Sequence, residues 1–475
     1  MRALLRWAVA LAALAAFLAG TAYIYLNYFF DLDRYRGDLA ALLSEKTGRQ
    51  VTIGAPLHFA FAPEPALSLG KVEATGPSLH ARARRLQLGF VAARPWPPVI
   101  ALRRLRVEGL RLALSPDRPR ALAWPATSPL TLGPVTLAPA PALRLTLRQT
   151  RIELSLAGRT WVLRGLDADL RLDAAAPSPT ARGRLRAAAL DTPYGSLHRP
   201  RAGLDASGGH VEAHDITAGL YSGDYRGDLT LDTGRPLSIR LRFSLAGFDV
   251  AAMLNRLSGA SPLSGRADAR GELSWRSLPG RSWAAGLDGR LRLEGSDLRL
   301  HDIDADDLLD RFKKSQRLDL VDIGAMALLG PLGAGLTKGR ELVGLAAGGK
   351  KGDETTIERV VGIWEVEHGV ARAVDVAFAT PRHLLALKGR VDLAAGRYMN
   401  TAVALVDRRG CALAVQKIRG DLKKPEIEKP DILSTLIGPV KNTLKLPLKI
   451  LGTDTCKPFY RGTLLGNTER SGNKL

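Results

Sequence analysis

The sequence predicts a mainly β protein built of antiparallel strands, with a few short helices and one N-terminal transmembrane helix. Three observations support this fold class. Apolar and polar residues alternate with period 2 through most of the chain. Prolines and glycines separate the alternating stretches, as turns separate strands. One long uncharged apolar run lies within the first thirty residues.

The apolar run covers residues 7–30 and is long enough for one helix to cross the ~30 Å hydrocarbon core of a membrane. Arg2 and Arg6 precede the run and two aspartates follow it, so residues 1–6 are predicted to be a cytoplasmic tail and the rest of the chain to be exported. The alternative is a cleaved signal peptide, for which Gly20 to Ala22 offers small residues at a cleavage site.

The chain has 475 residues, a formal net charge of +21 and an isoelectric point near 10.3. Such a charge indicates an anionic partner, and export excludes chromosomal nucleic acid as that partner. The two cysteines, Cys411 and Cys456, match no C-x-x-C redox or zinc pattern. An exported location makes a disulfide between them chemically permissible, the alternative being two unpaired thiols in a core.

Residues 31–115 are predicted to hold one amphipathic helix, 33–47, followed by short strands. Gly48 is well placed to end the helix. Period-2 alternation starts directly after it, and prolines mark the turns. The first apolar positions of these strands are Val51, Ile53, Leu57, Phe59 and Phe61.

Residues 116–142 are rich in proline and are predicted to form a long surface connection. Alternation returns over 143–300, where arginines and other polar residues separate the apolar positions. The first of these apolar positions are Leu145, Leu147, Ile152, Leu154 and Leu156. One face of the sheet is therefore apolar and the other solvated. Two readings stay open: a sandwich whose two apolar faces bury each other, or an open trough lined by one apolar face.

Short helices are predicted at 251–257 and 304–311. Residues 301–352 form an apolar, glycine-rich segment, and its two aspartates, Asp319 and Asp322, argue against a second membrane span, so paired helices are expected there. Strands resume over 353–430. Residues 431–475 form a basic amphipathic tail that carries a lysine cluster: Lys441, Lys445 and Lys449.

Motifs of enzymes are weak in this sequence. HVEAH at 210–214 places its glutamate one position too late for a zinc protease helix, and GLAAGGKK at 344–351 lacks the Ser or Thr that a phosphate-binding loop needs for Mg²⁺. A G-x-S-x-G nucleophile elbow does not occur. We therefore expect no enzyme, with no catalytic residue, no metal site and no cofactor.

Both ends of the chain resemble the AsmA family of inner-membrane-anchored periplasmic proteins. At the N-terminal end the resemblance rests on D-x-x-x-Y from Asp31, T-G-R-x-V-x-I over 47–53 and P-x-L-x-L-G-x-V over 65–72. At the C-terminal end it rests on GPLGAGLTKG and three further segments, which span 330–339, 362–393, 406–425 and 456–462. The region 116–300 carries little that is specific.

The resemblance implies an elongated, curved β-sheet with an open hydrophobic groove, similar to the chorein-type bridge proteins. It implies a single-pass protein of the inner membrane of a Gram-negative cell, with its bulk in the periplasm. The implied function is outer-membrane biogenesis by phospholipid transport between the two membranes. The alternative is a non-transporting scaffold that influences the assembly and targeting of outer-membrane proteins.

With this resemblance, the apolar strand positions given above become the expected lining of a lipid groove, and phospholipid acyl chains become the expected ligand. The inner membrane and outer-membrane components or lipopolysaccharide are the other expected partners, and nucleic acid is not. The positive charge then indicates attraction to anionic headgroups, with the cluster at Lys441, Lys445 and Lys449 facing the membrane surface. Solubility of the polar sheet face is the simpler explanation of the charge.

Overall fold

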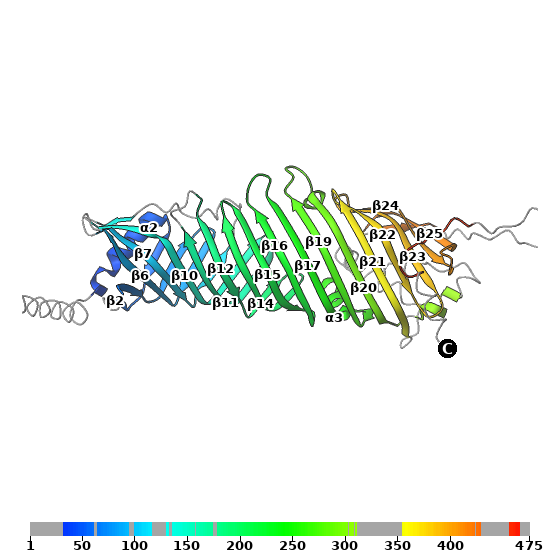
Figure 1. Cartoon of the computed structure of the whole chain (residues 1–475), viewed down its shortest axis with the longest axis horizontal. Helices are drawn as coiled ribbons and strands as arrows, with labels where there is room; N and C mark the ends of the chain where they lie inside the picture. The colour runs from blue at the N-terminus through cyan, green and yellow to red at the C-terminus, as the bar shows by residue number, and fades with distance from the viewer. Residues whose placement is uncertain are drawn as a thin grey trace, which may run out of the picture. The chain divides into compact units, whose positions relative to one another are not determined.

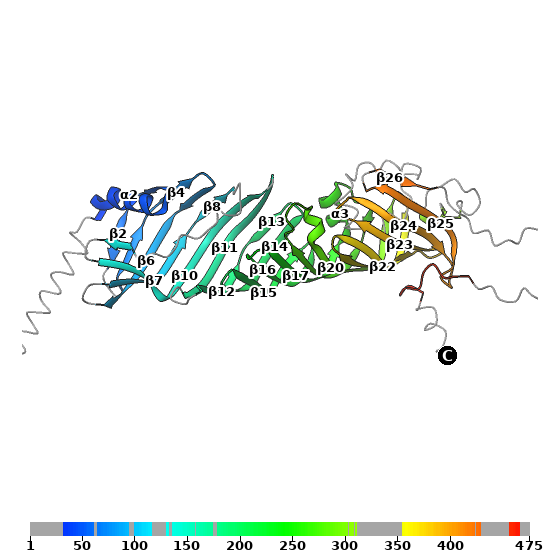
Figure 2. The ribbon, with the colours of Figure 1, turned by 90° about the horizontal axis from the view of Figure 1, so that it is seen from above.

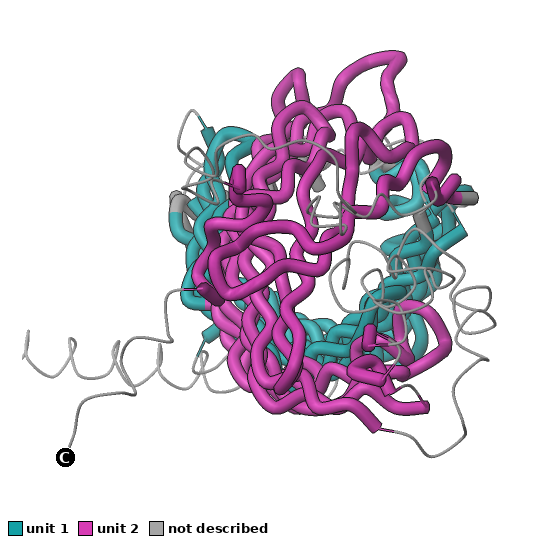
Figure 3. The backbone as a smooth tube through the Cα atoms, turned by 90° about the vertical axis from the view of Figure 1, so that its right-hand side faces the viewer, with its two compact units in different colours: residues 1–215 teal, residues 216–475 magenta. Residues whose placement is uncertain are grey.

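The computed structural model describes residues 32–60, 64–94, 99–115, 130–132, 135–156, 158–173, 178–302, 304–307, 309–310, 354–422, 424–428 and 456–465. Most of these residues lie in β-strands, with a few short helices (Figure 1), so the mainly β prediction is confirmed. The chain divides into two compact units, residues 1–215 and 216–475 (Figure 3). The division falls inside the predicted middle region 143–300.

Unit 1 begins with a helical segment that packs on its first strands. The 3-10 helix η2 (Leu32–Tyr35) leads into α2 (Arg36–Thr47), which ends at Gly48, where φ is 63° and the backbone is left-handed. Helix α2 lies beside the first strands of unit 1 (Figure 2). Its apolar side chains, among them Leu39 and Leu43, contact the first buried cluster of this unit. The backbone amide of Leu57 donates a hydrogen bond of 3.0 Å to the Asp33 carboxylate, which fixes the start of this segment.

Most strands of unit 1 are short at its N-terminal end and long afterwards. They are β1 (Gln50–Ile53), β2 (Leu57–Ala60), β3 (Ala66–Leu69), β4 (Val72–Gly76), β5 (Leu79–Ala83), β6 (Arg85–Arg94), β7 (Val99–Glu108), β8 (Arg111–Leu114), β9 (Leu130–Leu132), β10 (Val135–Leu156), β11 (Arg159–Asp173), β12 (Thr180–Arg186), β13 (Ala189–Thr192) and β14 (Gly195–Ser207). Strand β15 (His210–Leu220) contains the unit boundary.

The short strands pair as two series that meet on the same long strand. One series runs β1–β4–β5–β8 and the other β2–β3–β6–β7. Strand β7 pairs with the first part of β10, up to Arg148, and β8 pairs with the part that starts at Arg151. In the same way, β12 and β13 lie one after the other along β11 and β14. Each consecutive pair of short strands therefore takes the place of one long strand.

Residues with left-handed backbone stand where one short strand ends and the next begins, and at the corresponding positions of the long strands. They are Gly109 between β7 and β8, Gln149 in β10, Gly165 in β11 and Arg199 in β14, with φ of 65°, 51°, 62° and 49°. In β10 the ladder to β11 changes register between Leu147 and Ile152, as at a β-bulge. The bulge moves the apolar positions from odd to even numbers, and both sets stay on one face.

Two expectations about this unit are wrong. The sheet is not purely antiparallel, because β10 runs parallel to β7 and β8. A parallel neighbour needs a long connection, and the residues between Leu114 and Leu130 supply it. The predicted surface connection 116–142 also contains β9 and the start of β10. Pro139 and Pro141 are tolerated in β10 because they precede its pairing with β11, which starts at Leu143.

Unit 2 is an antiparallel meander. Its elements are β16 (Gly223–Asp232), β17 (Ser238–Asp249), α3 (Val250–Ser258), β18 (Leu263–Ser264), β19 (Arg266–Arg276), η4 (Trp283–Gly286), β20 (Leu287–His301), β21 (Glu354–Glu367), β22 (Val370–Ala379), β23 (Leu384–Asp392), β24 (Arg397–Val406), β25 (Ala412–Asp421) and β26 (Lys424–Ile427). From β19 to β26 each strand pairs with the next, β17 pairs with both β16 and β19, and the short β18 pairs with β20.

Helix α3 was predicted at 251–257. The Asp249 carboxylate caps it by accepting a hydrogen bond of 3.0 Å from the amide of Ala252, and Gly259 ends it in left-handed backbone. Met253 and Leu254 of this helix pack into the main core of unit 2, which runs from β17 to β25. Residues 305–307 and 309–310 are helical, and Leu309 joins the same core.

Residues 456–465 form a segment that we call the C-terminal clasp. A second buried cluster lies between this clasp and the face of β21–β25 that points away from the main core. A disulfide joins Cys411 to Cys456, with their Cα atoms 6.0 Å apart. Tyr460 of the clasp is buried and donates a hydrogen bond of 2.6 Å to the Asp375 carboxylate. Thr463 donates two more to the same carboxylate, from its backbone amide at 3.0 Å and its hydroxyl at 2.9 Å.

Several predicted features lie outside the described residues. They are the apolar run 7–30, Phe61, most of the glycine-rich segment 301–352 and the lysines of the tail: Lys441, Lys445 and Lys449. Within the described part of the chain, every helix is too short or too polar to cross a membrane.

Candidate functional site

Three continuous rows of apolar residues cross unit 1 from β1 and β2 to β14, as the pairing register shows. The first row is Phe59, Leu67, Leu88, Leu105, Leu145, Leu170, Gly183 and Leu204. The second row is Leu57, Leu69, Leu86, Val107, Leu147, Ala168, Leu185 and Ala202. The third row is Val51, Ala74, Ala81, Leu112, Ile152, Leu163, Leu190 and Leu197. We call these rows the apolar face.

Helix α2 covers one end of the apolar face, and burial varies further along, where Ala168 is 1% exposed but the leucines of β10 are more accessible. Val51, Ile53 and Leu57 are each only 8% exposed, because α2 packs on them. Leu145, Leu147, Ile152 and Leu154 of β10 are instead only partly buried. Among the described residues of unit 1, helices occur only over 32–47, so no helix covers this part of the sheet.

The other face of unit 1 is charged. Arginines and carboxylates oppose each other across neighbouring strands, as in Arg148–Asp169 at 3.0 Å and Arg182–Asp205 at 3.1 Å. Such exposed pairs contribute little to stability, but they keep this face solvated. Much of the arginine content of the chain is therefore neutralised locally and lies opposite the apolar face.

One polar group interrupts the apolar face. Thr150, at the bulge of β10, is fully buried, and its hydroxyl has no hydrogen-bond partner among the described residues. Thr150 lies opposite Leu166 of β11 and precedes Ile152 by two residues, so it belongs to the same face. The middle of the apolar face thus contains one buried hydroxyl.

The structure brings together most of the residues that the sequence suggested as a lining. Eight of them lie on the apolar face or directly beside it: Val51, Ile53, Leu57, Phe59, Leu145, Leu147, Ile152 and Leu154. Leu156 is in β10, but its side chain is not described, and Phe61 lies outside the described residues. The apolar residues of β3, β6, β7, β11 and β14 that complete the rows also belong to the alternating pattern of the sequence. Only the pairing register shows which of them lie next to each other in a row.

Histidines and carboxylates meet at two places without forming a metal site. His214 contacts Asp205 at 3.1 Å and Asp215 at 2.9 Å, and the hydrogen bond with Asp215 raises the pKa of His214. In unit 2, buried His383 lies between Asp306 at 2.9 Å and Asp310 at 3.1 Å and ties the helical residues near 305–310 to the β22–β23 turn. Within the described ranges, no group of three or more His, Cys, Asp or Glu could hold a metal ion.

Comparison with known proteins gives one match. A model of the AsmA family matches residues 199–342, which run from within β14 through β20 and end among the residues that the structure does not describe. Neither the curated proteins nor the solved structures contain a match to the chain. Of the segments that carry the resemblance in the sequence, only 330–339 lies inside the matched range.

Proposed function

The chain belongs to the AsmA family by its match over residues 199–342, and on this premise we propose that it holds phospholipid acyl chains on the apolar face of unit 1. The proposed role is outer-membrane biogenesis: residues 7–30 anchor the protein in the inner membrane, and the β-sheet in the periplasm carries phospholipid between the inner and outer membranes.

The observation that supports this proposal most strongly is the continuity of the three apolar rows. A diacyl lipid has roughly 30 methylene groups, and exposing them to water at ~0.8 kcal/mol each would cost on the order of 20 kcal/mol. A row that continues from strand to strand offers an apolar contact at every step across the sheet. An acyl chain that moves along such a row avoids most of this cost, so no catalytic group is needed.

The difference between the two units supports unit 1 as the lipid site. In unit 2 the apolar side chains from β20 to β25 are packed into a core, with Phe378 and Leu385 fully buried. In unit 1 the leucines of β10 remain partly exposed. Acyl chains therefore find partly exposed apolar side chains on β10 of unit 1, where the described residues contain no covering helix.

The test introduces a charge into the middle row. Leu147→Asp places a carboxylate between Val107 and Ala168, where acyl chains would have to desolvate it. We expect the phospholipid that co-purifies with the full chain, measured by mass spectrometry, to fall by about tenfold or more, since burying a charge costs several kcal/mol.

The matched control is Ser155→Asp, which adds the same charge to β10 on its polar face, opposite Thr160. We expect this variant to retain its lipid. If wild-type protein carries no lipid, or if both variants lose it equally, the lipid-carrying function is wrong. The alternative function as a scaffold for outer-membrane protein assembly predicts that Leu147→Asp leaves that assembly intact.

A further inference from the structure

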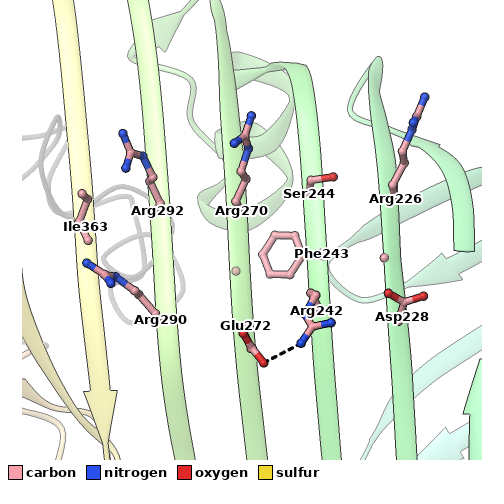
Figure 4. A pocket seen from close by; sticks show the side chains of 12 residues that line it. Arg226, Asp228, Arg242, Phe243, Ser244, Arg270, Glu272, Arg290, Arg292 and Ile363 are labelled. Carbon is pink, nitrogen blue, oxygen red and sulfur yellow. Dashed lines mark hydrogen bonds and ion pairs between the residues drawn. The ribbon is translucent and has the colours of Figure 1, made fainter. Parts of the chain in front are cut away.

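A hollow of about 640 Å³ lies on the polar face of unit 2, across β16, β17, β19, β20 and β21 (Figure 4). Five arginines line it: Arg226, Arg242, Arg270, Arg290 and Arg292. Two carboxylates, Asp228 and Glu272, are the acidic groups in this lining. The hollow therefore has an excess of three positive charges in its own wall.

Two neighbouring rows of side chains form the wall, and they differ in charge pattern. The lower row in Figure 4 continues beyond the hollow and alternates in sign: Asp228, Arg242, Glu272, Arg290, Glu365 and Arg372. Its charges are paired, with Arg242 and Glu272 3.1 Å apart and Arg290 and Glu365 3.8 Å apart. This row is electrically balanced without any ligand.

Within the hollow the upper row contains no carboxylate, and beyond Ile363 it continues to Asp375, which accepts hydrogen bonds from Tyr460 and Thr463. The part in the hollow consists of Arg226, Ser244, Arg270, Arg292 and Ile363 in direct cross-strand register. Arg270 lies opposite Arg292, and like charges at directly opposed positions destabilise a sheet. Among the described residues, neither Arg226 nor Arg270 has an ion-pair partner within 4.0 Å. Arg292 does have one, Glu294 of its own strand, at 2.6 Å, and the same carboxylate also attracts Arg270 electrostatically.

The small side chain of Ser244 separates the two unpaired arginines. Because neighbouring strands are ~4.8 Å apart, Arg226 and Arg270 start roughly 10 Å from each other, with only a hydroxymethyl group between them. Both side chains are exposed, and Figure 4 shows them extending along the same side of the hollow. Two guanidinium groups and one hydroxyl thus border a single space, and no carboxylate lies between them in this row.

We propose that the upper row, Arg226, Ser244 and Arg270 with Arg292 beside them, is a binding site for a phosphate group. Guanidinium groups bind tetrahedral oxyanions through paired, charge-assisted hydrogen bonds, and a hydroxyl supplies a further donor. A bound phosphate supplies the negative charge that the row lacks within the hollow and offsets the repulsion between Arg270 and Arg292. The phosphate belongs to a lipid headgroup or to a free phosphate ion, and these two sources share the same chemistry.

The experiment measures binding to the full chain in neutral detergent by isothermal titration calorimetry. The probes are inorganic phosphate and glycerophosphoglycerol, the water-soluble diester headgroup of an anionic phospholipid. The test variant is Arg226→Gln with Arg270→Gln. The control variant is Arg242→Gln with Arg290→Gln, which removes the same charge from the same hollow but from the balanced row.

We expect the test variant to bind its best probe at least about tenfold more weakly than wild type, the loss expected for two charge-assisted hydrogen bonds, and the control variant to stay within about twofold. Stronger binding of glycerophosphoglycerol identifies a headgroup site, and stronger binding of inorganic phosphate identifies a site for the free ion. Equal weakening in both variants, or no binding of either probe to wild type at on the order of 10 mM, overturns the proposal.

A second measurement does not depend on calorimetric heat. A ligand that binds the folded state raises the thermal midpoint. The probe that binds should raise the midpoint of wild type and of the control variant but not that of the test variant. The test variant without ligand should be at least as stable as wild type, because it loses like-charge repulsion. A test variant that is still stabilised by the probe contradicts the site.

Discussion

At the scale of single residues, the Asp375 carboxylate of β22 is the polar group that holds the C-terminal clasp. It is buried and accepts three hydrogen bonds, from the Tyr460 hydroxyl and from the amide and hydroxyl of Thr463. Burial raises the pKa of Tyr460, and the hydrogen bond to Asp375 raises it further. The clasp therefore needs the neutral form of Tyr460.

This requirement predicts alkaline sensitivity. Below the unfolded pKa of tyrosine, ~10, the contribution of Tyr460 is fully present, and above it the unfolded state ionises while the folded state does not. We expect Tyr460→Phe to be less stable than wild type by about 1–3 kcal/mol at pH 8, and the difference to shrink by up to about 1.4 kcal/mol per pH unit above pH 10. Urea unfolding from pH 8 to pH 11 measures this.

Thr463→Ala is the control, since it removes a donor to the same carboxylate without removing the titrating hydroxyl. Its stability difference from wild type should not change over this pH range. A Tyr460→Phe difference that is equally constant would show that the hydroxyl does not couple folding to pH.

At the scale of elements, β-bulges allow the long strands β10 and β11 to keep their apolar side chains on one face. Gln149 in β10 and Gly165 in β11 both have left-handed backbone, which glycine adopts freely and other residues adopt at a cost of roughly 1–2 kcal/mol. A Cβ atom at Gly165 would also lie 3.1 Å from the Cβ of Ala188. The left-handed backbone is therefore adopted by a favourable residue, Gly165, in β11 and by an unfavourable one, Gln149, in β10.

Opposite substitutions at these two bulges should have opposite effects. We expect Gly165→Ala to lower the free energy of unfolding by about 1–2 kcal/mol, and Gln149→Gly to leave it unchanged or raise it slightly, because the Gln149 amide keeps its hydrogen bond to Asp167. Urea midpoints of the two variants provide the measurement. Loss of stability in Gln149→Gly comparable to that in Gly165→Ala would contradict a common bulge geometry.

At the scale of the whole molecule, the two units differ in how far the apolar side of their strands is buried. Unit 2 packs α3 and the residues near 305–310 onto its apolar side, whereas unit 1 leaves the leucines of β10 partly exposed. A lipid carried by this protein should therefore contact one unit and not the core of the other.

Site-specific photocrosslinking tests this division. A photoreactive benzoylphenylalanine at Leu170, on the apolar face, should yield a phospholipid adduct in membranes. The same group at Arg171 on the polar face, or at fully buried Phe378 in unit 2, should yield none. Labelling at Phe378 as strong as at Leu170, or no labelling at Leu170, would be incompatible with lipid held on unit 1 alone.

Much of this fold follows from local patterns. The helix before Gly48, the helix after Asp249 and the strands from 354 onward were predictable because caps and period-2 alternation are local signals. The parallel pairing of β10 was not, since it depends on a long connection and on distant partners. The prolines of β10 favoured a surface connection over 116–142, but a proline prevents backbone pairing on only one side of a strand.

The residues that carry the family resemblance lie at the two ends of the chain, whereas the family model matches 199–342, much of which is alternating sequence common to many β proteins. The phosphate site was also beyond sequence reasoning. Arg270 and Arg242 occupy the same kind of alternating position, and only the register places one opposite Arg292 and the other opposite Glu272.

The sequence by itself determined that one face of the strands is apolar and the other charged, because side chains of a strand point alternately to its two faces. The tertiary structure decided which strands are neighbours, how the bulges join odd and even positions into continuous rows, and where a helix covers those rows. These depend on contacts between residues far apart in the chain, such as Leu57 with Leu69 and then Leu86, which no local pattern specifies.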